Sequence, residues 1–580
     1  MAFIVSPDVP LRRINPGVDF GRWEAVEPHF AELNRRPLHG APDLEDWLLD
    51  LSELHSALEE ERNVREVEMT CQTDDPLRER RYLAFIEDIL PKARVAFYEL
   101  DRRLLTSPGV ADLPSQRYGM LLRRVRNRVQ LFREENVPLH TLDETLRQQY
   151  QKITGCMTVR LDGQELTLEQ AARWLEWPDR GRRQEAWEAT WERRLRDREV
   201  LEDLFDEMIR LRDRIARNAD LPDYRAYAFR DLERFDYGPD DCLRFHAAVE
   251  RVGVPAARAL HSERQASLGV DRLRPWDTNV DPRGRPPLQP FSTADDLMER
   301  CGRIFRRISG EFGAQFERMR REGLLDLASR KGKAPGGYMT VFELRRLPFI
   351  FMNAVGVHRD VETLLHEGGH AFHAFATRGE PLHAYRNPPI EFAEVASMGM
   401  ELLGLPLLDE FYGGADRERA AREHFEGITA FFPWMATIDA FQHWLYTNPG
   451  HDRAARRAVW LDLRGRFGGL EDYAGHEDAL ASLWQRQLHP FTVPFYYVEY
   501  GIAQLGALQV WRNSVRDFAA AVAAYRAALS LGGSRPLPEL FAAAGARLDF
   551  SDATFAQALA AVQEQIAGLR GDECPRVRRR

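Results

Sequence analysis

The residues best suited to catalysis are the two histidines and the glutamate of His366-Glu367-Gly368-Gly369-His370, which follow the pattern H-E-x-x-H. In a helix, residues four apart lie about one turn apart on the same face, so both imidazoles would point the same way. Two neutral histidines at this spacing can bind one zinc ion, and Glu367 can act as general base toward the metal-bound water. A zinc peptidase is therefore the leading hypothesis.

The segment VETLLHEGGHAFHAF, residues 361–375, has the pattern of an amphipathic helix around this motif. Its apolar residues recur at the i, i+3, i+4, i+7 spacing of a buried face. The polar stripe on the other side consists of Glu362, His366, His370 and His373. Because two consecutive glycines weaken a helix, we expect them to allow close approach of another backbone or of a substrate.

A zinc site of this kind needs a third protein ligand, and the predicted helix 391–403 offers acidic candidates. Glu391, Glu394 and Glu401 lie near one face of that helix. Their spacing alone does not choose among them.

A second chemically dense segment is LHPFTVPFYYVEYGIAQLGAL, which contains His489, Tyr496, Tyr497 and Tyr500. The ordinary interpretation is a tyrosine cluster in the core. The alternative is a set of donors whose hydroxyl groups point at a reacting carbonyl.

Composition restricts the function classes. The chain has 580 residues, 44% hydrophobic and 29% charged, and a net charge of −10 that does not favour nucleic-acid binding. Five scattered cysteines without a C-x-x-C pair predict neither a disulfide framework nor a cysteine zinc site. The first residues do not resemble a signal peptide, and no apolar stretch approaches 18 residues, so we expect no membrane span and a cytoplasmic location.

Most of the chain has helical periodicity, with β signals at two places. Residues 157–166 predict a hairpin turning at Asp162-Gly163, and Thr167 with Gln170 predicts a capping box after it. Runs 338–344 and 348–354 predict a second hairpin just before the H-E-x-x-H helix. The 348–354 strand either holds an extended substrate backbone at its edge or belongs to a purely structural sheet. Residues 1–43 are Pro-rich and predicted to be an irregular arm.

Several separated segments resemble the thimet oligopeptidase and oligoendopeptidase F family of zinc metallopeptidases, and most closely its oligoendopeptidase F branch. They are QKITGCMTVRLDGQELTL, RFDYGPDDC, GGYMTVFELRRLPFIFMNAVG, DVETLLHEGGHAFH, EFAEVASMGMELL, TIDAFQHWLY and HPFTVPFYYVEYG. They extend from about residue 150 to residue 510.

The resemblance implies the site residues. The family motif E-F-x-E-x-x-S places the third zinc ligand at Glu394, while Glu401 and Glu362 match glutamates that orient the ligands. His489, Tyr496 and Tyr500 match the segment that stabilises the tetrahedral intermediate, and Tyr497 is an equal rival of Tyr496 on geometry. Relatives carry a bulky apolar residue at Gly368, so we expect this glycine to enlarge the space near the metal or to loosen the helix.

The resemblance also implies the architecture. We expect a mainly α protein: a two-lobed helical ellipsoid around a deep substrate channel, with a small β-sheet beside the H-E-x-x-H helix. Residues 1–190 would form an N-terminal helical lobe and residues 191–580 the zinc peptidase catalytic region. Such a protein would use one zinc ion to hydrolyse internal bonds of short peptides.

Two other functions remain open. One is a metallocarboxypeptidase with the same zinc core, although the sequence shows no clear cationic clamp for a terminal carboxylate. The other is a catalytically silent helical scaffold with a structural zinc ion, which normally needs four protein ligands rather than three. Sequence does not predict the cleavage preference or choose between a monomer and a homo-oligomer.

Overall fold

The computed structural model describes residues 10–15, 17–330, 332–334 and 336–569, and it is mainly helical with two small sheets. The predicted mainly α class is confirmed. The buried apolar side chains of the described residues form two clusters, a smaller one near the N-terminus and a larger one that contains the rest of the core. Among the described residues, no helix is both long and apolar enough to cross a membrane.

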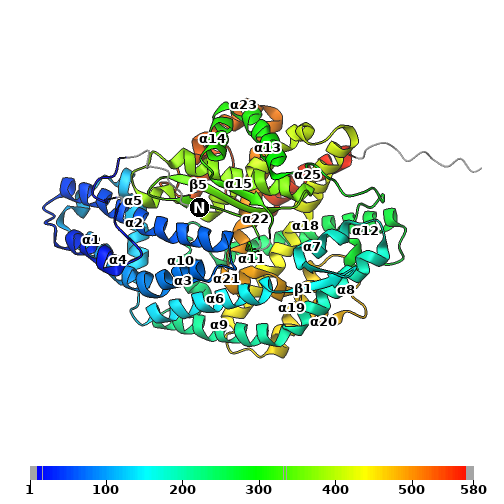
Figure 1. Cartoon of the computed structure of the whole chain (residues 1–580), viewed down its shortest axis with the longest axis horizontal. Helices are drawn as coiled ribbons and strands as arrows, with labels where there is room; N and C mark the ends of the chain where they lie inside the picture. The colour runs from blue at the N-terminus through cyan, green and yellow to red at the C-terminus, as the bar shows by residue number, and fades with distance from the viewer. Residues whose placement is uncertain (1–9, 16, 331, 335, 570–580) are drawn as a thin grey trace, which may run out of the picture.

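The N-terminal helices lie at one end of the molecule, drawn in blue in Figure 1. They are α1 (Trp23–Arg35), α2 (Ala41–Cys71), α3 (Pro76–Ala84), α4 (Leu90–Thr106) and α5 (Ser115–Leu131). The next helix, α6 (Asn136–Gly155), is drawn in cyan and runs along the lower middle of the view in Figure 1. The predicted irregular arm is wrong over α1, because Val26, Phe30 and Leu33 form an apolar stripe that is buried. This burial outweighs the hydrogen bond that Pro28 removes from the helix.

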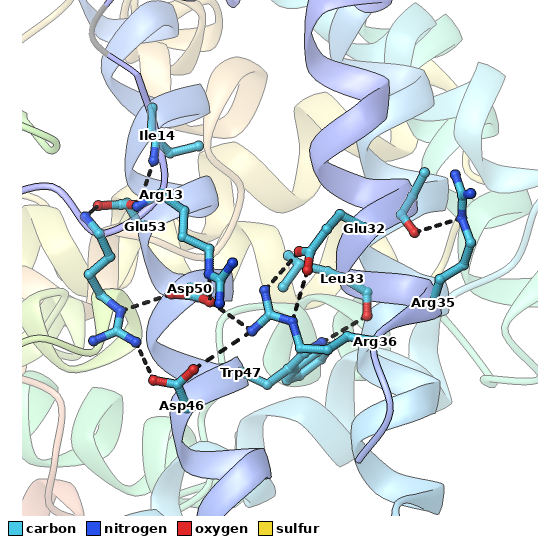
Figure 2. A network of polar contacts seen from close by, with 12 residues as sticks. Arg13, Ile14, Glu32, Leu33, Arg35, Arg36, Asp46, Trp47, Asp50 and Glu53 are labelled. Carbon is cyan, nitrogen blue, oxygen red and sulfur yellow. Dashed lines mark hydrogen bonds and ion pairs between the residues drawn. The ribbon is translucent and has the colours of Figure 1, made fainter.

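Charged side chains fix the chain before α1 onto α2, as Figure 2 shows. The buried Asp50 carboxylate accepts hydrogen bonds from Arg12 Nε at 2.8 Å, Arg13 Nε at 2.5 Å and Arg36 Nη1 at 2.7 Å. Burial opposes the charge of Asp50, but Arg12 and Arg36 outweigh it and lower the pKa of this carboxyl group. The segment before α1, which packs against the smaller apolar cluster, is therefore held by ion pairs as well as by apolar packing.

Helical periodicity over residues 180–218, 239–267 and 294–322 predicts three single helices, but each of them is divided in the structure. The breaks fall between α8 (Arg180–Arg196) and α9 (Arg198–Asn218), α11 (Pro239–Ala248) and α12 (Val254–Leu268), and α13 (Ala294–Ile308) and α14 (Gly310–Arg321). A π turn at Val249–Gly253 separates the second pair just before Pro255, which lacks the N–H that a continuous helix needs. Periodicity continued across these breaks, so it did not reveal them.

Both predicted hairpins are present. β1 (Thr158–Leu161) and β2 (Gln164–Thr167) turn at Asp162 and Gly163, whose φ angles are positive, and the Thr167–Gln170 capping box opens α7 (Leu168–Ala172). The second sheet has the order β3-β5-β4, with β3 (Leu325–Ala328) parallel and β4 (Tyr338–Phe342) antiparallel to β5 (Leu347–Ala354).

This strand order corrects the role predicted for residues 348–354. Because β5 is hydrogen-bonded to a strand on each side, it has no free edge to pair with a substrate. Backbone pairing with a peptide is left to the outer strands β3 and β4.

The remaining helices build the core around the H-E-x-x-H segment. They are α10 (Tyr224–Asp231), α15 (His358–Thr377), α16 (His383–Arg386), α17 (Ile390–Gly404), α18 (Gly414–Thr447), α19 (Arg453–Phe467), α20 (Glu477–Ala481), α21 (Leu488–Thr492), α22 (Tyr497–Arg516), α23 (Phe518–Leu529), α24 (Leu537–Ala543) and α25 (Asp552–Gly568). α17 packs against both α15 and α22 near the centre of the molecule (Figure 1). These three helices position the site.

Candidate active site

The helix that carries H-E-x-x-H begins at a carboxylate cap that joins it to β5. Asp360 Oδ2 accepts hydrogen bonds from the backbone N–H groups of Val355, Gly356 and Val357 at 2.8, 2.8 and 3.0 Å. The negative charge also suits the helix N-terminus. The cap therefore fixes the direction in which α15 leaves the sheet.

Gly369 allows α17 to approach α15 closely. A Cβ atom at this position would lie 2.5 Å from the carbonyl oxygen of Ala396 and 2.6 Å from Cα of Ser397. The expected close approach of another backbone is thus present, and it brings the acidic residues of α17 to the histidines.

Glu394 meets both motif histidines. Its Oε2 atom lies 3.3 Å from His366 Nε2 and 3.5 Å from His370 Nε2. One ligand atom from each of the three residues lies within 4.8 Å of the others. Two imidazole nitrogens and one carboxylate oxygen gathered this closely form a donor set that fits zinc.

Neighbouring side chains orient these three residues. Tyr496 Oη donates to Glu394 Oε1 at 2.9 Å, and Ser397 Oγ donates to Glu394 Oε2 at 2.8 Å. His366 Nδ1 lies 2.6 Å from Glu401 Oε1, which leaves Nε2 directed at the ligand cluster. Burial opposes the charge of Glu394, but His370 and His366 outweigh it and hold the pKa of its carboxyl group well below the usual range.

The polar network extends behind Glu401. His424 Nδ1 lies 2.8 Å from Glu362 Oε1, and His424 Nε2 lies 3.8 Å from Glu401 Oε2. Glu362 therefore reaches His366 only through His424 and Glu401, rather than by the direct contact with a ligand histidine that the resemblance suggested.

Glu367 has the properties of a general base. It is 6% exposed, and its Oε2 atom has no hydrogen-bond partner among the described residues. Burial raises the pKa of this carboxyl group, which brings it closer to the range in which a carboxylate accepts a proton efficiently at neutral pH.

His489 is held as a neutral imidazole with its proton on Nε2. Trp434 Nε1 donates to Gln487 Oε1 at 3.1 Å, and since indole is only a donor, the amide nitrogen of Gln487 faces His489 Nδ1 at 2.6 Å. Nδ1 is then the acceptor and Nε2 carries the proton. Burial lowers the pKa of His489 to about 4.

The tyrosines surround His489 in different ways. Its ring centre lies 6.0 Å from that of Tyr496, 4.6 Å from that of Tyr497 and 5.7 Å from that of Tyr500. The structure places the hydroxyl of Tyr496 on Glu394, whereas the ring of Tyr497 packs near Phe431.

Phe495, just before Tyr496, has a φ angle of 68°, which is unusual for a residue other than glycine. Its N–H donates to Gln442 Oε1 at 2.7 Å, and its carbonyl accepts from Arg234 Nη2. These contacts compensate for the backbone strain, so the turn presents Tyr496 in one orientation.

Other predicted residues face elsewhere. Glu391 accepts a 2.6 Å hydrogen bond from Tyr237 and lines a cavity of about 410 Å³ between the N-terminal helices and the start of α17. His373 is 3% exposed and packs edge-on against Phe392, so its assignment to the polar stripe is wrong.

Of the two effects expected of Gly368, the enlarged space near the metal is wrong, whereas the loosened helix stays a prediction. A Cβ atom there would lie 2.5 Å from the ring of Phe305, which fills the space beside the glycine. The residue therefore leaves room for a core phenylalanine rather than enlarging the metal site.

The sequence predicts no role for Ser397, Gln487 or His424, although Ser397 is the serine of the E-F-x-E-x-x-S motif. Ser397 carried a usable signal, because a serine three residues after Glu394 returns to the same face of α17. Gln487 and His424 come from other elements, and no spacing near the motif points to them.

Residues 174–560 match the model of peptidase family M3. The chain belongs to this family. This membership agrees with the family resemblance found in the sequence. It places the chain among the metallopeptidases.

Curated M3-type relatives match over part of their length. Oligopeptidase PepF of Bacillus subtilis (strain 168) is 27% identical over 232 residues, which are 38% of this chain and 34% of the relative. Group B oligopeptidase PepB of Streptococcus agalactiae serotype III (strain NEM316) is 23% identical over 303 residues, 50% of this chain and 49% of the relative. The aligned segments thus span about a third and about half of these relatives.

Solved structures match over nearly the whole chain. PZ peptidase A with inhibitor 2 has a TM-score of 0.91 at 26% identity, over 96% of this chain and 99% of that one. An oligoendopeptidase F structure has a TM-score of 0.89 at 29% identity, over 96% and 98%. The chain therefore has the same overall fold as these two structures.

Proposed function

We propose that this chain is a zinc-dependent endopeptidase that hydrolyses internal bonds of short oligopeptides. The observation that carries the proposal is the meeting of His366, His370 and Glu394 within 4.8 Å, with the unpartnered carboxylate of Glu367 on the same helix. Family membership and the names of the relatives support the same reaction class.

His366, His370 and Glu394 would hold one zinc ion and leave a coordination position for water or substrate. When bound, the ion lowers the pKa of water and polarises the peptide carbonyl. The side chains of the two histidines are 22% and 15% exposed, so a substrate can reach this side of the cluster, whereas Glu394 at 4% is closed off behind them.

Glu367 would move the proton. Its raised pKa allows it to accept a proton from the attacking water and to deliver it to the nitrogen of the departing amine. The unpartnered Oε2 atom is available for this transfer without breaking an existing hydrogen bond.

His489 and the tyrosines would stabilise the negative charge that develops on the carbonyl oxygen. The Nε2–H of His489 is a neutral donor, and Tyr500 or Tyr496 supplies a hydroxyl donor. Because Tyr496 already donates to Glu394, Tyr500 is the better candidate for direct contact with substrate.

The remaining parts of the proposal concern access and location. Residues 1–190 would form the helical lobe that closes over the catalytic region 191–580 and leaves a channel that excludes folded proteins. The cysteines within the described residues are free thiols, which supports a reducing compartment such as the cytoplasm.

Product analysis by mass spectrometry tests the reaction. Peptides of eight to twelve residues would be offered with free ends and with acetylated and amidated ends. We expect cleavage inside both sets. Release of single C-terminal residues from unblocked peptides alone would indicate a carboxypeptidase, and intact peptides in both sets would indicate a silent scaffold.

A further inference from the structure

A second group of metal-ligand side chains lies where α11 and α18 meet, near the middle of the molecule in Figure 1. α11 carries Cys242 and His246, and α18 carries Asp439 and His443, so each helix presents two residues four positions apart. Such pairs lie on one face of a helix. One donor atom each from Cys242, Asp439 and His443 lies within 4.8 Å of the others. His246 is not part of this close group, but its Nε2 atom lies 2.7 Å from Asp439 Oδ2.

All four side chains are in the protein interior. Cys242 and Asp439 are 0% exposed, His246 is 3% exposed and His443 is 4% exposed. Nevertheless, Asp439 Oδ1 and His443 Nε2 have no hydrogen-bond partner among the described residues. Unpaired polar atoms at this depth are costly, so the protein groups alone leave the cluster unsatisfied.

The spacing inside this group resembles the spacing at the proposed catalytic site. His443 Nε2 lies 3.3 Å from Asp439 Oδ2 without hydrogen-bond geometry, and His366 Nε2 lies 3.3 Å from Glu394 Oε2. Zinc bonds of 2.0–2.3 Å in tetrahedral geometry place neighbouring ligand atoms roughly 3.3–3.7 Å apart. One histidine–carboxylate pair in each group therefore has the separation that a shared ion would produce, whereas His246 Nε2, at 2.7 Å from Asp439 Oδ2, lies at hydrogen-bond distance and would have to turn toward the ion.

We propose that Cys242, His246, Asp439 and His443 form a second zinc site with a structural role. A thiolate and a carboxylate contribute two negative charges that neutralise the ion, so the loaded site carries no net charge in the core. Binding replaces the hydrogen bond between His246 and Asp439 with two bonds to the same metal and gives the unpaired Nε2 atom of His443 a partner. Four protein ligands close the site to substrate.

The competing arrangement is a metal-free polar network. In it, Asp439 accepts from His246, and the Arg225 guanidinium lies 3.5 Å from His443 Nδ1. This network leaves His443 Nε2 unpaired and assigns no role to the thiol of Cys242.

The position of the site suggests what it stabilises. The ring of His443 lies edge-on to Phe495, with centres 5.4 Å apart, and Gln442 binds the Phe495 N–H. A metal held by α18 would therefore rigidify the turn that presents Tyr496. This consequence rests on the proposed function, whereas the metal site itself does not.

Metal counting separates the two arrangements. Purified full-length protein and the His366→Ala/His370→Ala variant would be analysed for zinc by inductively coupled plasma mass spectrometry. We expect two zinc ions per chain in the first and one in the variant. One zinc ion in the unmutated protein and none in the variant would overturn the second site while leaving the proposed catalytic site intact.

Cobalt spectroscopy identifies the ligands. Protein produced in cobalt-supplemented medium should show a near-ultraviolet cobalt–thiolate charge-transfer band, because the second site has a cysteine and the catalytic site has none. The band should persist in His366→Ala/His370→Ala and disappear in Cys242→Ser. Cys301→Ala is the matched control, since Cys301 is equally buried but belongs to no metal-ligand group among the described residues. Absence of the band from the unmutated protein would contradict the proposal without any variant.

Discussion

The two carboxylate–histidine groups of this molecule differ in what surrounds them. At α15 and α17 the imidazoles are partly exposed, the carboxylate is held by Tyr496 and Ser397, and Glu367 stands beside the cluster with an unpaired oxygen. At α11 and α18 the four side chains are buried, and no glutamate belongs to the group among the described residues. The difference agrees with the two proposals, since an open site with a neighbouring carboxylate suits chemistry and a closed one suits a structural role.

The largest expected effect is on the open group. Glu394→Ala should remove one zinc ion per chain and reduce kcat/KM by at least about 10³-fold, since metal polarisation is worth several kcal/mol. Metal analysis and hydrolysis of a quenched peptide measure both quantities. Glu391→Ala is the control, because Glu391 faces Tyr237 one turn away and should keep the zinc. Equal metal loss in the two variants would contradict the ligand assignment.

The next largest effect concerns the tyrosine hydrogen-bond donors, which are found beside the open group at α15 and α17. Tyr500→Phe should lower kcat by about 10²–10³-fold without loss of zinc, because it removes a donor to the developing charge. Tyr497→Phe keeps the same ring size beside His489 but should change kcat by less than about threefold, since its ring packs near Phe431. Steady-state kinetics of the pair decide this, and a similar fall in both would remove Tyr500 from the proposed role.

A smaller effect is expected one contact away from the ion. Glu401→Ala should weaken zinc binding by about 10–100-fold, because His366 Nδ1 loses its acceptor. Competition with a chromogenic chelator measures the affinity. Glu401→Gln retains an acceptor oxygen and should recover most of the loss. Unchanged affinity in Glu401→Ala would show that other contacts orient the histidine.

How far the sequence could predict these features depends on how far apart the interacting residues lie along the chain. The motif helix, both hairpins and the base came from local spacing, because helices and turns express their requirements within a few residues. The choice of Glu394 needed family resemblance, since the packing of α17 against α15, closest at Gly369, is not visible in the spacing of either helix. The pairing of β3 with β5 and the meeting of Cys242 with Asp439 join segments far apart in the chain. No periodicity records such contacts.

The smallest effect comes from a carboxylate that is fully paired by protein groups. Asp326 accepts hydrogen bonds from Lys333 at 2.9 Å and from Arg330 at 2.6 and 2.7 Å, so it contrasts with the unpaired oxygen of Asp439. Burial opposes its charge, but Arg330 and Lys333 outweigh it and lower the pKa of Asp326 to about 2.

Because the folded pKa lies below the unfolded value, this pairing stabilises the protein above about pH 4, and the stabilisation is lost as pH falls toward 2. Asp326→Asn should therefore remove about 1 kcal/mol of the unfolding free energy at pH 6, after solvent screening is allowed for, and much less near pH 2.5. Urea unfolding at the two pH values measures the difference. A pH-independent difference would mean that lost packing, not charge pairing, causes it.

The most direct test of the account is Glu367→Gln, measured for zinc content and for cleavage of an end-blocked peptide in the same preparation. The substitution preserves the size of the side chain and leaves His366, His370 and Glu394 unchanged. We predict unchanged zinc and a fall in kcat/KM of about 10²–10⁴-fold, the contribution of a general base. Retained hydrolysis with full zinc would contradict the assignment of Glu367 and, with it, the proposed mechanism.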